Sequence, residues 1–95
     1  MTYKERKQFV EDPMNWEVAG EMPGMRILEL DYGGHAWYKA EILQATGNGF
    51  REWIEIRKFK YLPEANAFTA PISSAEIIEE IKRIDEEGRH IGKKK

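Results

Sequence analysis

The chain has no cysteine, which removes several classes of protein at once. Without cysteine there is no disulfide framework, no thiolate nucleophile and no zinc ribbon, and the absence fits a reducing compartment. No apolar run approaches the length of a membrane span, and the charged segment 4–7 is not followed by the apolar core of a signal peptide. We therefore expect an intracellular protein, cytoplasmic, nucleoid-associated or nuclear, with no membrane partner.

Histidine is also scarce, and groupings of catalytic residues are missing. His35 and His90 are far apart in the sequence and have no carboxylate at metal-ligand spacing. Glu41 and Glu55 are expected to lie opposite each other on paired strands, but no nucleophile or histidine accompanies them. We interpret them as a solvated pair at the rim of the sheet. The sequence predicts no metal site, no cofactor and no enzymatic activity.

The 95 residues are enough for one domain. We expect an N-terminal arm over residues 1–14, a single domain of four strands and one helix over 15–88, and a basic tail over 89–95. A chain this short buries little apolar surface, so a homodimer is expected.

Runs of alternating apolar and polar residues predict four strands, over residues 16–19, 25–32, 37–46 and 50–61. Gly33-Gly34-His35 and Gly47-Asn48-Gly49 are expected to be three-residue loops, the second with Gly49 in a left-handed conformation. Residues 62–67 are interpreted as an excursion before 68–71. The fold class is α+β, a four-stranded antiparallel sheet followed by one C-terminal helix.

These loops determine which side chains share a face, because side chains alternate along a strand. The expected core face carries Leu28, Leu30, Tyr38, Ala40, Ile42, Ile54 and Ile56, with Tyr38 opposite Lys58. The opposite face is expected to carry Trp37, Lys39, Leu43, Arg51, Trp53, Arg57, Phe59 and Tyr61. The second face therefore combines aromatic and basic side chains.

The C-terminal helix has clear start and stop signals. Ser73 and Glu76 fit a capping box, and Gly88 is positioned to end the helix. Isoleucines at helical spacing form an apolar stripe that consists of Ile77, Ile78, Ile81 and Ile84. We expect this stripe to cover the core face and to leave the aromatic and basic face open.

Charge is unevenly divided along the sequence. Residues 73–87 hold six acids against two bases, whereas residues 37–61 hold five bases against three acids. If the helix packs on the core face, its acids point away from the aromatic and basic face. That face then fits a platform for single-stranded nucleic acid, in which bases stack on rings and cations follow phosphates. The other interpretation is a homodimer interface without a nucleic-acid ligand.

A resemblance supports the nucleic-acid interpretation. The strand Trp53-Ile54-Glu55-Ile56-Arg57-Lys58-Phe59, followed by Ile72-Ser73-Ser74-Ala75-Glu76 and an amphipathic helix, resembles the single-stranded-DNA-binding coactivator family called positive cofactor 4. The resemblance implies a curved sheet, a dimer formed through the helix and final strand, and DNA contacts from Arg57, Lys58 and Phe59. Such a protein acts as an accessory factor in transcription, replication or repair. The purine-rich-element-binding proteins are similar and imply the same ligand class.

A second resemblance implies a different function. Asp31-Tyr32-Gly33-Gly34 followed by Ala36-Trp37-Tyr38-Lys39-Ala40-Glu41-Ile42-Leu43 looks like the Tudor/Agenet pattern. Such domains are bent barrels that bind methylated side chains in an aromatic cage. The cage would need Tyr32, Trp37 or Tyr38, and Trp53 or Phe59 to converge.

Overall fold

A computed structural model describes residues 1–62 and 67–93, with side chains described for 1–61 and 71–88. The elements, in chain order, are α1 (Tyr3–Glu11), a 3-10 turn η1 (Pro13–Asn15), β1 (Glu17–Met22), β2 (Met25–Tyr32), β3 (His35–Ala45), β4 (Arg51–Leu62), β5 (Ala67–Pro71) and α2 (Ser74–Lys93). The predicted excursion over 62–67 lies largely outside the described residues.

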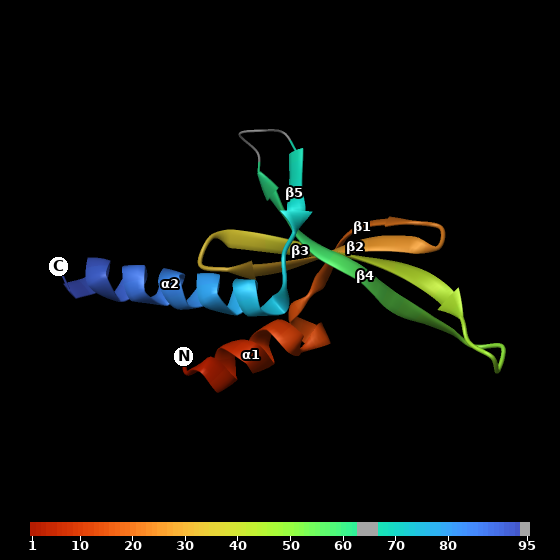
Figure 1. Cartoon of the computed structure of the whole chain (residues 1–95), viewed down its shortest axis with the longest axis horizontal. Helices are drawn as coiled ribbons and strands as arrows, with labels where there is room; N and C mark the ends of the chain where they lie inside the picture. The colour runs from red at the N-terminus through yellow and green to blue at the C-terminus, as the bar shows by residue number, and fades with distance from the viewer. Residues whose placement is uncertain (63–66, 94–95) are drawn as a thin grey trace.

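The strands form one antiparallel sheet in which each strand pairs with its neighbour in sequence. Over the described residues the order is β1-β2-β3-β4-β5 (Figure 1). The predicted α+β class, an antiparallel sheet followed by a C-terminal helix, is confirmed. The structure adds β5 beside β4 and a helix before the sheet.

The β2–β3 connection is shorter than predicted. Gly33 and Gly34 have positive φ angles of 57° and 82°, and Tyr32 pairs with His35, so the turn contains two residues rather than three. Two successive left-handed residues are typical of a tight hairpin turn. The shift of one residue turns Leu28 and Leu30 toward the face of Trp37 and reverses the predicted core face.

The β3–β4 hairpin begins as predicted and then departs from the predicted register. Gly49 has a φ of 79°, and the Thr46 amide donates to the Phe50 carbonyl at 2.7 Å, which confirms the three-residue loop. The pairs nearest the loop are confirmed as Leu43–Trp53, Ile42–Ile54 and Glu41–Glu55. A β-bulge then inserts Ile56 as an extra residue of β4. Beyond it, the observed pairs are Ala40–Arg57, Lys39–Lys58 and Tyr38–Phe59.

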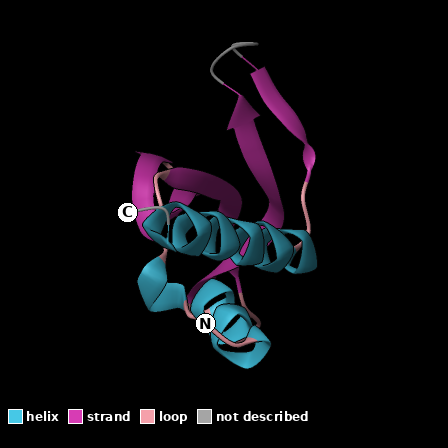
Figure 2. Cartoon of the chain, turned by 90° about the vertical axis from the view of Figure 1, so that its left-hand side faces the viewer, coloured by secondary structure: helices cyan, strands magenta, loops and turns pink. Residues whose placement is uncertain are grey.

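The core lies between the sheet and the two helices, on the Trp37 face. Figure 2 shows both helices next to each other on one side of the strands. The buried cluster consists of Val10, Trp16, Leu28, Leu30, Trp37, Ile77, Ile78 and Ile81. The prediction that α2 would cover Ile42 and Ile54 is therefore wrong, because both isoleucines lie on the opposite face of the sheet.

The N-terminal segment is part of this core rather than a loose arm. Thr2 and Glu5 form a capping box at the start of α1, and Val10 is buried against α2 and the sheet. The Trp16 indole donates to the Val10 carbonyl at 2.8 Å, which ties η1 to the end of α1.

The start of α2 is confirmed and its end is not. The Glu76 amide donates to the Ser73 hydroxyl at 3.2 Å, and the Ser73 amide donates to the Glu76 carboxylate at 3.3 Å. Three members of the isoleucine stripe, Ile77, Ile78 and Ile81, are buried as predicted, and Ile84 is partly buried against the core. The helix continues through Gly88 to Lys93, so residues 89–93 extend it instead of forming a tail. The side chains of His90 and of the terminal lysines lie outside the described residues.

Candidate nucleic-acid interface

The eight candidate binding residues lie on two faces of the sheet, although seven of them were predicted on the aromatic and basic face and Lys58 on the core face. On the helix side lie Trp37, Lys39, Arg51, Trp53 and Lys58. On the other side lie Arg57, Phe59 and Tyr61. The cause is Ile56: an extra residue in β4 reverses the alternation of every side chain that follows it.

Two of the rings assigned to the aromatic and basic face are buried. Trp37 is 0% exposed in the core, and its Nε1 donates to Glu80 at 3.1 Å. Phe59 is 4% exposed and stacks on Tyr38 with a centroid distance of 5.8 Å. The prediction that Trp37 and Phe59 stack on bases is therefore wrong.

Another surface does combine aromatic and basic groups. On the helix side of the sheet, beyond the reach of the helices, the ends of β2, β3 and β4 form an arm (Figure 1). We call the side chains of this region the arm surface. It consists of Arg26, Lys39, Glu41, Arg51, Trp53, Glu55 and Lys58. It holds four of the eight predicted residues together with Arg26, which the sequence interpretation missed.

Arg26 is at the centre of the arm surface. Its guanidinium carbon lies 4.2 Å from the centroid of the Trp53 ring, and its Nε donates to Glu41 at 2.8 Å. A guanidinium that stacks on an indole and bonds a carboxylate is held in one orientation. A two-residue turn at Gly33-Gly34 places Arg26 opposite Glu41, so the length of this turn is the feature of the sequence that would have predicted the position of Arg26.

Lys39 lies where the arm surface meets the core. Its Nζ is 4.6 Å from the Trp16 ring centroid and 3.8 Å from a carboxylate oxygen of Glu41. Burial lowers the pKa of Lys39 below its ordinary value, although the nearby charges of Glu41 and Glu55 act in the opposite direction. A cation that has lost part of its hydration gains more from a neighbouring anion than a fully solvated one.

Glu41 and Glu55 are opposite each other, as the sequence predicted, but they do not form an isolated acid pair. Glu41 is bonded to Arg26, and both oxygens of Glu55 accept from Lys58 Nζ at 2.8 Å. Cations therefore offset the repulsion expected for like charges on facing strand positions. The arm surface has four cations and two acids, so its net charge is positive.

Charge is separated along the molecule rather than across the sheet. α2, with its excess of acids, extends in one direction from the sheet, and the arm extends in the other (Figure 1). The prediction that the helix would lie on the opposite face from the basic residues is wrong. The molecule is 57 Å long, and the acids of α2 and the arm surface lie toward opposite ends of it.

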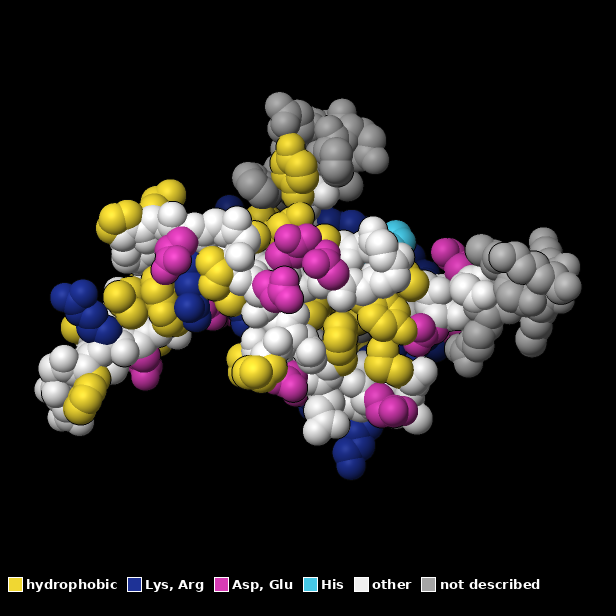
Figure 3. Space-filling view, turned by 180° about the vertical axis from the view of Figure 1, so that it is seen from behind, with side chains coloured by type: hydrophobic (Ala, Val, Ile, Leu, Met, Phe, Trp, Pro, Cys, Tyr) yellow, Lys and Arg dark blue, Asp and Glu magenta, His cyan; other side chains and the backbone are white. Residues whose placement is uncertain are grey.

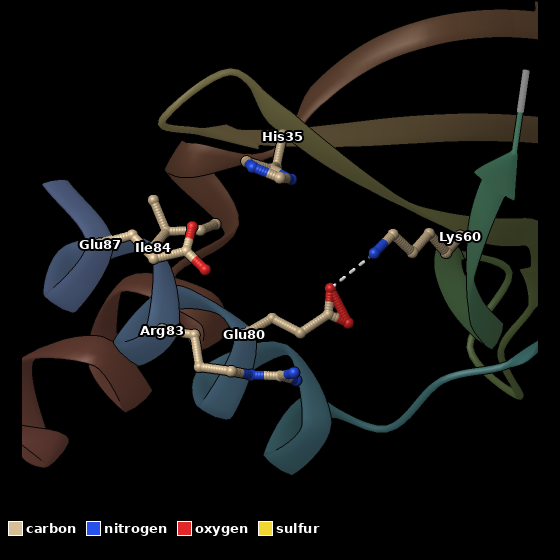
Figure 4. A pocket seen from close by; sticks show the side chains of 6 residues that line it. All are labelled: His35, Lys60, Glu80, Arg83, Ile84 and Glu87. Atoms are coloured by element: carbon tan, nitrogen blue, oxygen red, sulfur yellow. Dashed lines mark hydrogen bonds and ion pairs between the residues drawn. The ribbon is translucent and has the colours of Figure 1, made fainter. Parts of the chain in front are cut away.

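A shallow cavity of about 330 Å³ lies between the first residue of β3, the end of β4 and α2 (Figure 4). Lys60 Nζ donates to Glu80 at 2.8 Å within it. Burial alone raises the pKa of Glu80, but hydrogen bonds from Lys60 and Trp37 outweigh burial, so the pKa lies below its ordinary value. The remaining lining residues are His35, Arg83, Ile84 and Glu87. Acids and bases balance here, and the ion pair links the sheet to α2.

The geometry does not fit an aromatic cage. Tyr32 packs edge-on against Phe9, Trp37 is buried in the core, and Trp53 lies on the arm beneath Arg26. Tyr38 and Phe59 stack on the opposite face of the sheet. The rings that the Tudor/Agenet pattern would bring together therefore do not converge.

Comparisons with family models, curated proteins and solved structures find no match to this chain. The resemblance to the positive cofactor 4 family stays a prediction. Among the described residues, no helix is long and apolar enough to cross a membrane, and no group of three or more histidines and carboxylates is placed to hold a metal ion.

Proposed function

We propose that this protein binds single-stranded nucleic acid through the arm surface. The supporting observation is that Arg26 stacks on Trp53, with its guanidinium carbon 4.2 Å from the ring centroid, on a surface whose net charge is positive. A ring beside cations that lie along a strand is the combination that binds bases and phosphates together. The proposed role is binding, with no catalytic step.

The arm residues take different roles in this proposal. Arg51 is exposed near the hairpin loop, and Lys58 lies nearer the core. A single-stranded nucleic acid that runs along the arm from the loop toward the core passes Arg51 first and then Lys58. Both contact phosphates. Trp53, which is half-buried, offers the ring surface not occupied by Arg26 to a base. Glu41 orients Arg26 through their 2.8 Å hydrogen bond.

The proposed ligand is single-stranded because stacking on Trp53 needs a base whose face is free. In a duplex, both faces of each base are covered by neighbouring bases, and only backbone contacts would remain. The protein should therefore prefer an unpaired strand to a duplex of the same length. The preference should persist as salt rises, because stacking depends less on ionic strength than phosphate contacts do.

Fluorescence titration tests the proposal. Trp16 and Trp37 are buried, so quenching by oligo-dT of about twelve nucleotides should come from Trp53. Trp53→Phe should abolish the quenching and keep most of the affinity, whereas Trp53→Ala should cost about 1–3 kcal/mol of binding. Tyr3→Ala removes an exposed ring from α1 and is the matched control. Equal affinity for duplex and single strand, or unchanged binding by Trp53→Ala, would contradict the proposal.

A second pair of variants distinguishes the two sheet faces. Arg51→Ala removes an exposed cation from the arm surface, and Arg57→Ala removes an exposed cation of the same strand from the opposite face. We expect weaker binding for Arg51→Ala and no change for Arg57→Ala. The reverse result would place the strand on the face that the positive cofactor 4 resemblance implies.

A further inference from the structure

The face of the sheet opposite the helices is apolar at its centre. We call it the open face. Its central residues are Met25, Ile27, Ala40, Ile42 and Ile54. No described helix packs on these residues, and the buried cluster on the other side of the sheet does not include them. Ile42 is 36% exposed, and Ile56 in the bulge beside it is 52% exposed. Exposed aliphatic side chains grouped on one sheet face are typical of an interface.

The chain exposes more surface than a compact monomer of its mass. Its accessible area is 6910 Å², whereas about 5,700 Å² is expected for 11.1 kDa. Its radius of gyration is 15.7 Å, against about 12 Å expected for this length. The excess area is larger than the roughly 800 Å² that each partner buries in a standard interface. The chain as a whole therefore exposes enough surface to form an interface of standard size.

Charges flank the apolar centre on opposite sides. Glu29 and Asp31 lie on β2, with Glu17 of β1 beside Glu29. The hydrogen bond with Asp31, then burial and the charges of Asp31 and Glu17, raise the pKa of Glu29, so these acids repel one another. Arg57 is on the same face but on β4, which flanks β3 on the side away from β2. Its guanidinium carbon is 5.9 Å from the Phe59 ring centroid. The one cation of β2, Arg26, lies on the helix side of the sheet, so on the open face the nearest strand with a cation is β4, where Arg57 lies across the sheet from the acids.

We infer that a second copy of this chain packs on the open face, with the two sheets face to face around a two-fold axis parallel to β3. Such an axis puts β2 of one copy over β4 of the other and keeps positions along the strands level. Glu29 of the second copy then lies over Phe59, the ring toward which Arg57 leans. The aliphatic centres meet each other, and each Arg57 meets the acids of the other copy. Sheets packed in this way lie about 10 Å apart.

This dimer differs from the one that the coactivator resemblance implies. That dimer uses the C-terminal helix, but the isoleucine stripe of α2 is already buried in the core of one chain. The inferred dimer leaves both arm surfaces facing outward, away from the interface. It therefore does not depend on nucleic-acid binding, and either proposal can fail without the other. Hydrophobic side chains are visible over the arm and the middle of the molecule in the rear view (Figure 3).

Light scattering during size exclusion tests the inference. We expect twice the 11.1 kDa monomer mass for the wild type at high micromolar concentration. Ile42→Asp and Ile54→Asp should each raise the dimer dissociation constant about a hundredfold or more, because each puts two carboxylates into an apolar centre. Val18→Asp changes an exposed aliphatic residue of β1 that lies on the helix side, and it should leave the dimer intact. Circular dichroism should show that all three variants remain folded.

A charge reversal tests the direction of the axis. Arg57→Glu and Glu29→Arg should each weaken the dimer about tenfold, and the double variant should restore it, because the opposite charges meet again across the interface. A monomeric wild type would overturn the inference, as would a dimer that Ile42→Asp and Ile54→Asp leave unchanged. A double variant no tighter than the single variants would overturn the proposed axis. Dissociation of the dimer by oligo-dT would assign the open face to nucleic acid instead.

Discussion

The indole of Trp37 donates to the carboxylate of Glu80 at 3.1 Å, joining the centre of β3 to α2. Lys60 of β4 donates to the same oxygen at 2.8 Å. A tryptophan that is fully buried needs a partner for its N–H group, and this carboxylate supplies it. The relationship explains why the helix covers the Trp37 face of the sheet and leaves the isoleucines of β3 and β4 on the other.

Trp37→Phe should destabilise the fold by about 1–3 kcal/mol, since it removes core volume and leaves Glu80 without its indole donor. Glu79→Gln, at an exposed neighbouring position of α2, is the control and should leave stability unchanged. Urea unfolding followed by circular dichroism gives the free energy of unfolding for each variant. Wild-type stability in Trp37→Phe would show that the contact does not hold the helix to the sheet.

The contribution of Glu80 to stability should depend on pH. Its pKa is lower in the folded protein than its ordinary 4.5, so the folded state binds the proton less well than the unfolded state. The stabilisation is fully present above that ordinary value and disappears as pH falls through the folded pKa. The free energy of unfolding of the wild type should therefore exceed that of Glu80→Gln at about pH 6, and the difference should shrink toward about pH 3. A difference that grows on acidification would show that the pKa is raised.

The β2–β3 turn offers a matched pair of glycine substitutions. Gly33 and Gly34 both have positive φ angles, but an added Cβ at Gly33 would lie 2.6 Å from Cγ2 of Ile84, whereas the space at Gly34 is open. Gly34→Ala should cost about 1 kcal/mol for backbone strain alone, and Gly33→Ala should cost at least about twice as much. In an Ile84→Ala background the cost at Gly33 should fall toward that at Gly34, as urea unfolding would measure. Equal costs in the wild-type background would mean that the helix moves away freely.

The sequence predicted those features that depend on neighbouring residues. The capping box of Ser73 and Glu76, the isoleucine stripe and the loop ending at Gly49 all follow from local chemistry, and the structure confirms them. The assignment of faces failed at two positions. One was the Gly33-Gly34 turn, where the Gly-Gly pair fits a two-residue turn but was assigned to a three-residue loop, and the other was the extra residue Ile56, which has no local signal in an otherwise regular strand. Each shifts the strand register by one residue, which moves every later side chain to the other face.

The candidate site was predictable to the extent that it depended on one hairpin. Arg51 and Trp53 lie between the loop and the bulge, so their shared face was predicted correctly. Arg57 and Phe59 lie beyond the bulge and were assigned to the wrong partners. Arg26 is on a different strand, and only the register of β2 against β3 brings it to Trp53.

The salt dependence of oligo-dT affinity tests the proposed arm surface most directly. For the wild type, the logarithm of the association constant should fall linearly with the logarithm of salt concentration between about 50 and 200 mM. Removing two phosphate contacts with Arg51→Ala and Lys58→Ala together should make the slope shallower by about 1.4, whereas Arg57→Ala should leave it unchanged. A double variant whose slope matches that of the wild type would contradict the account, because its cations would then lie away from the phosphates.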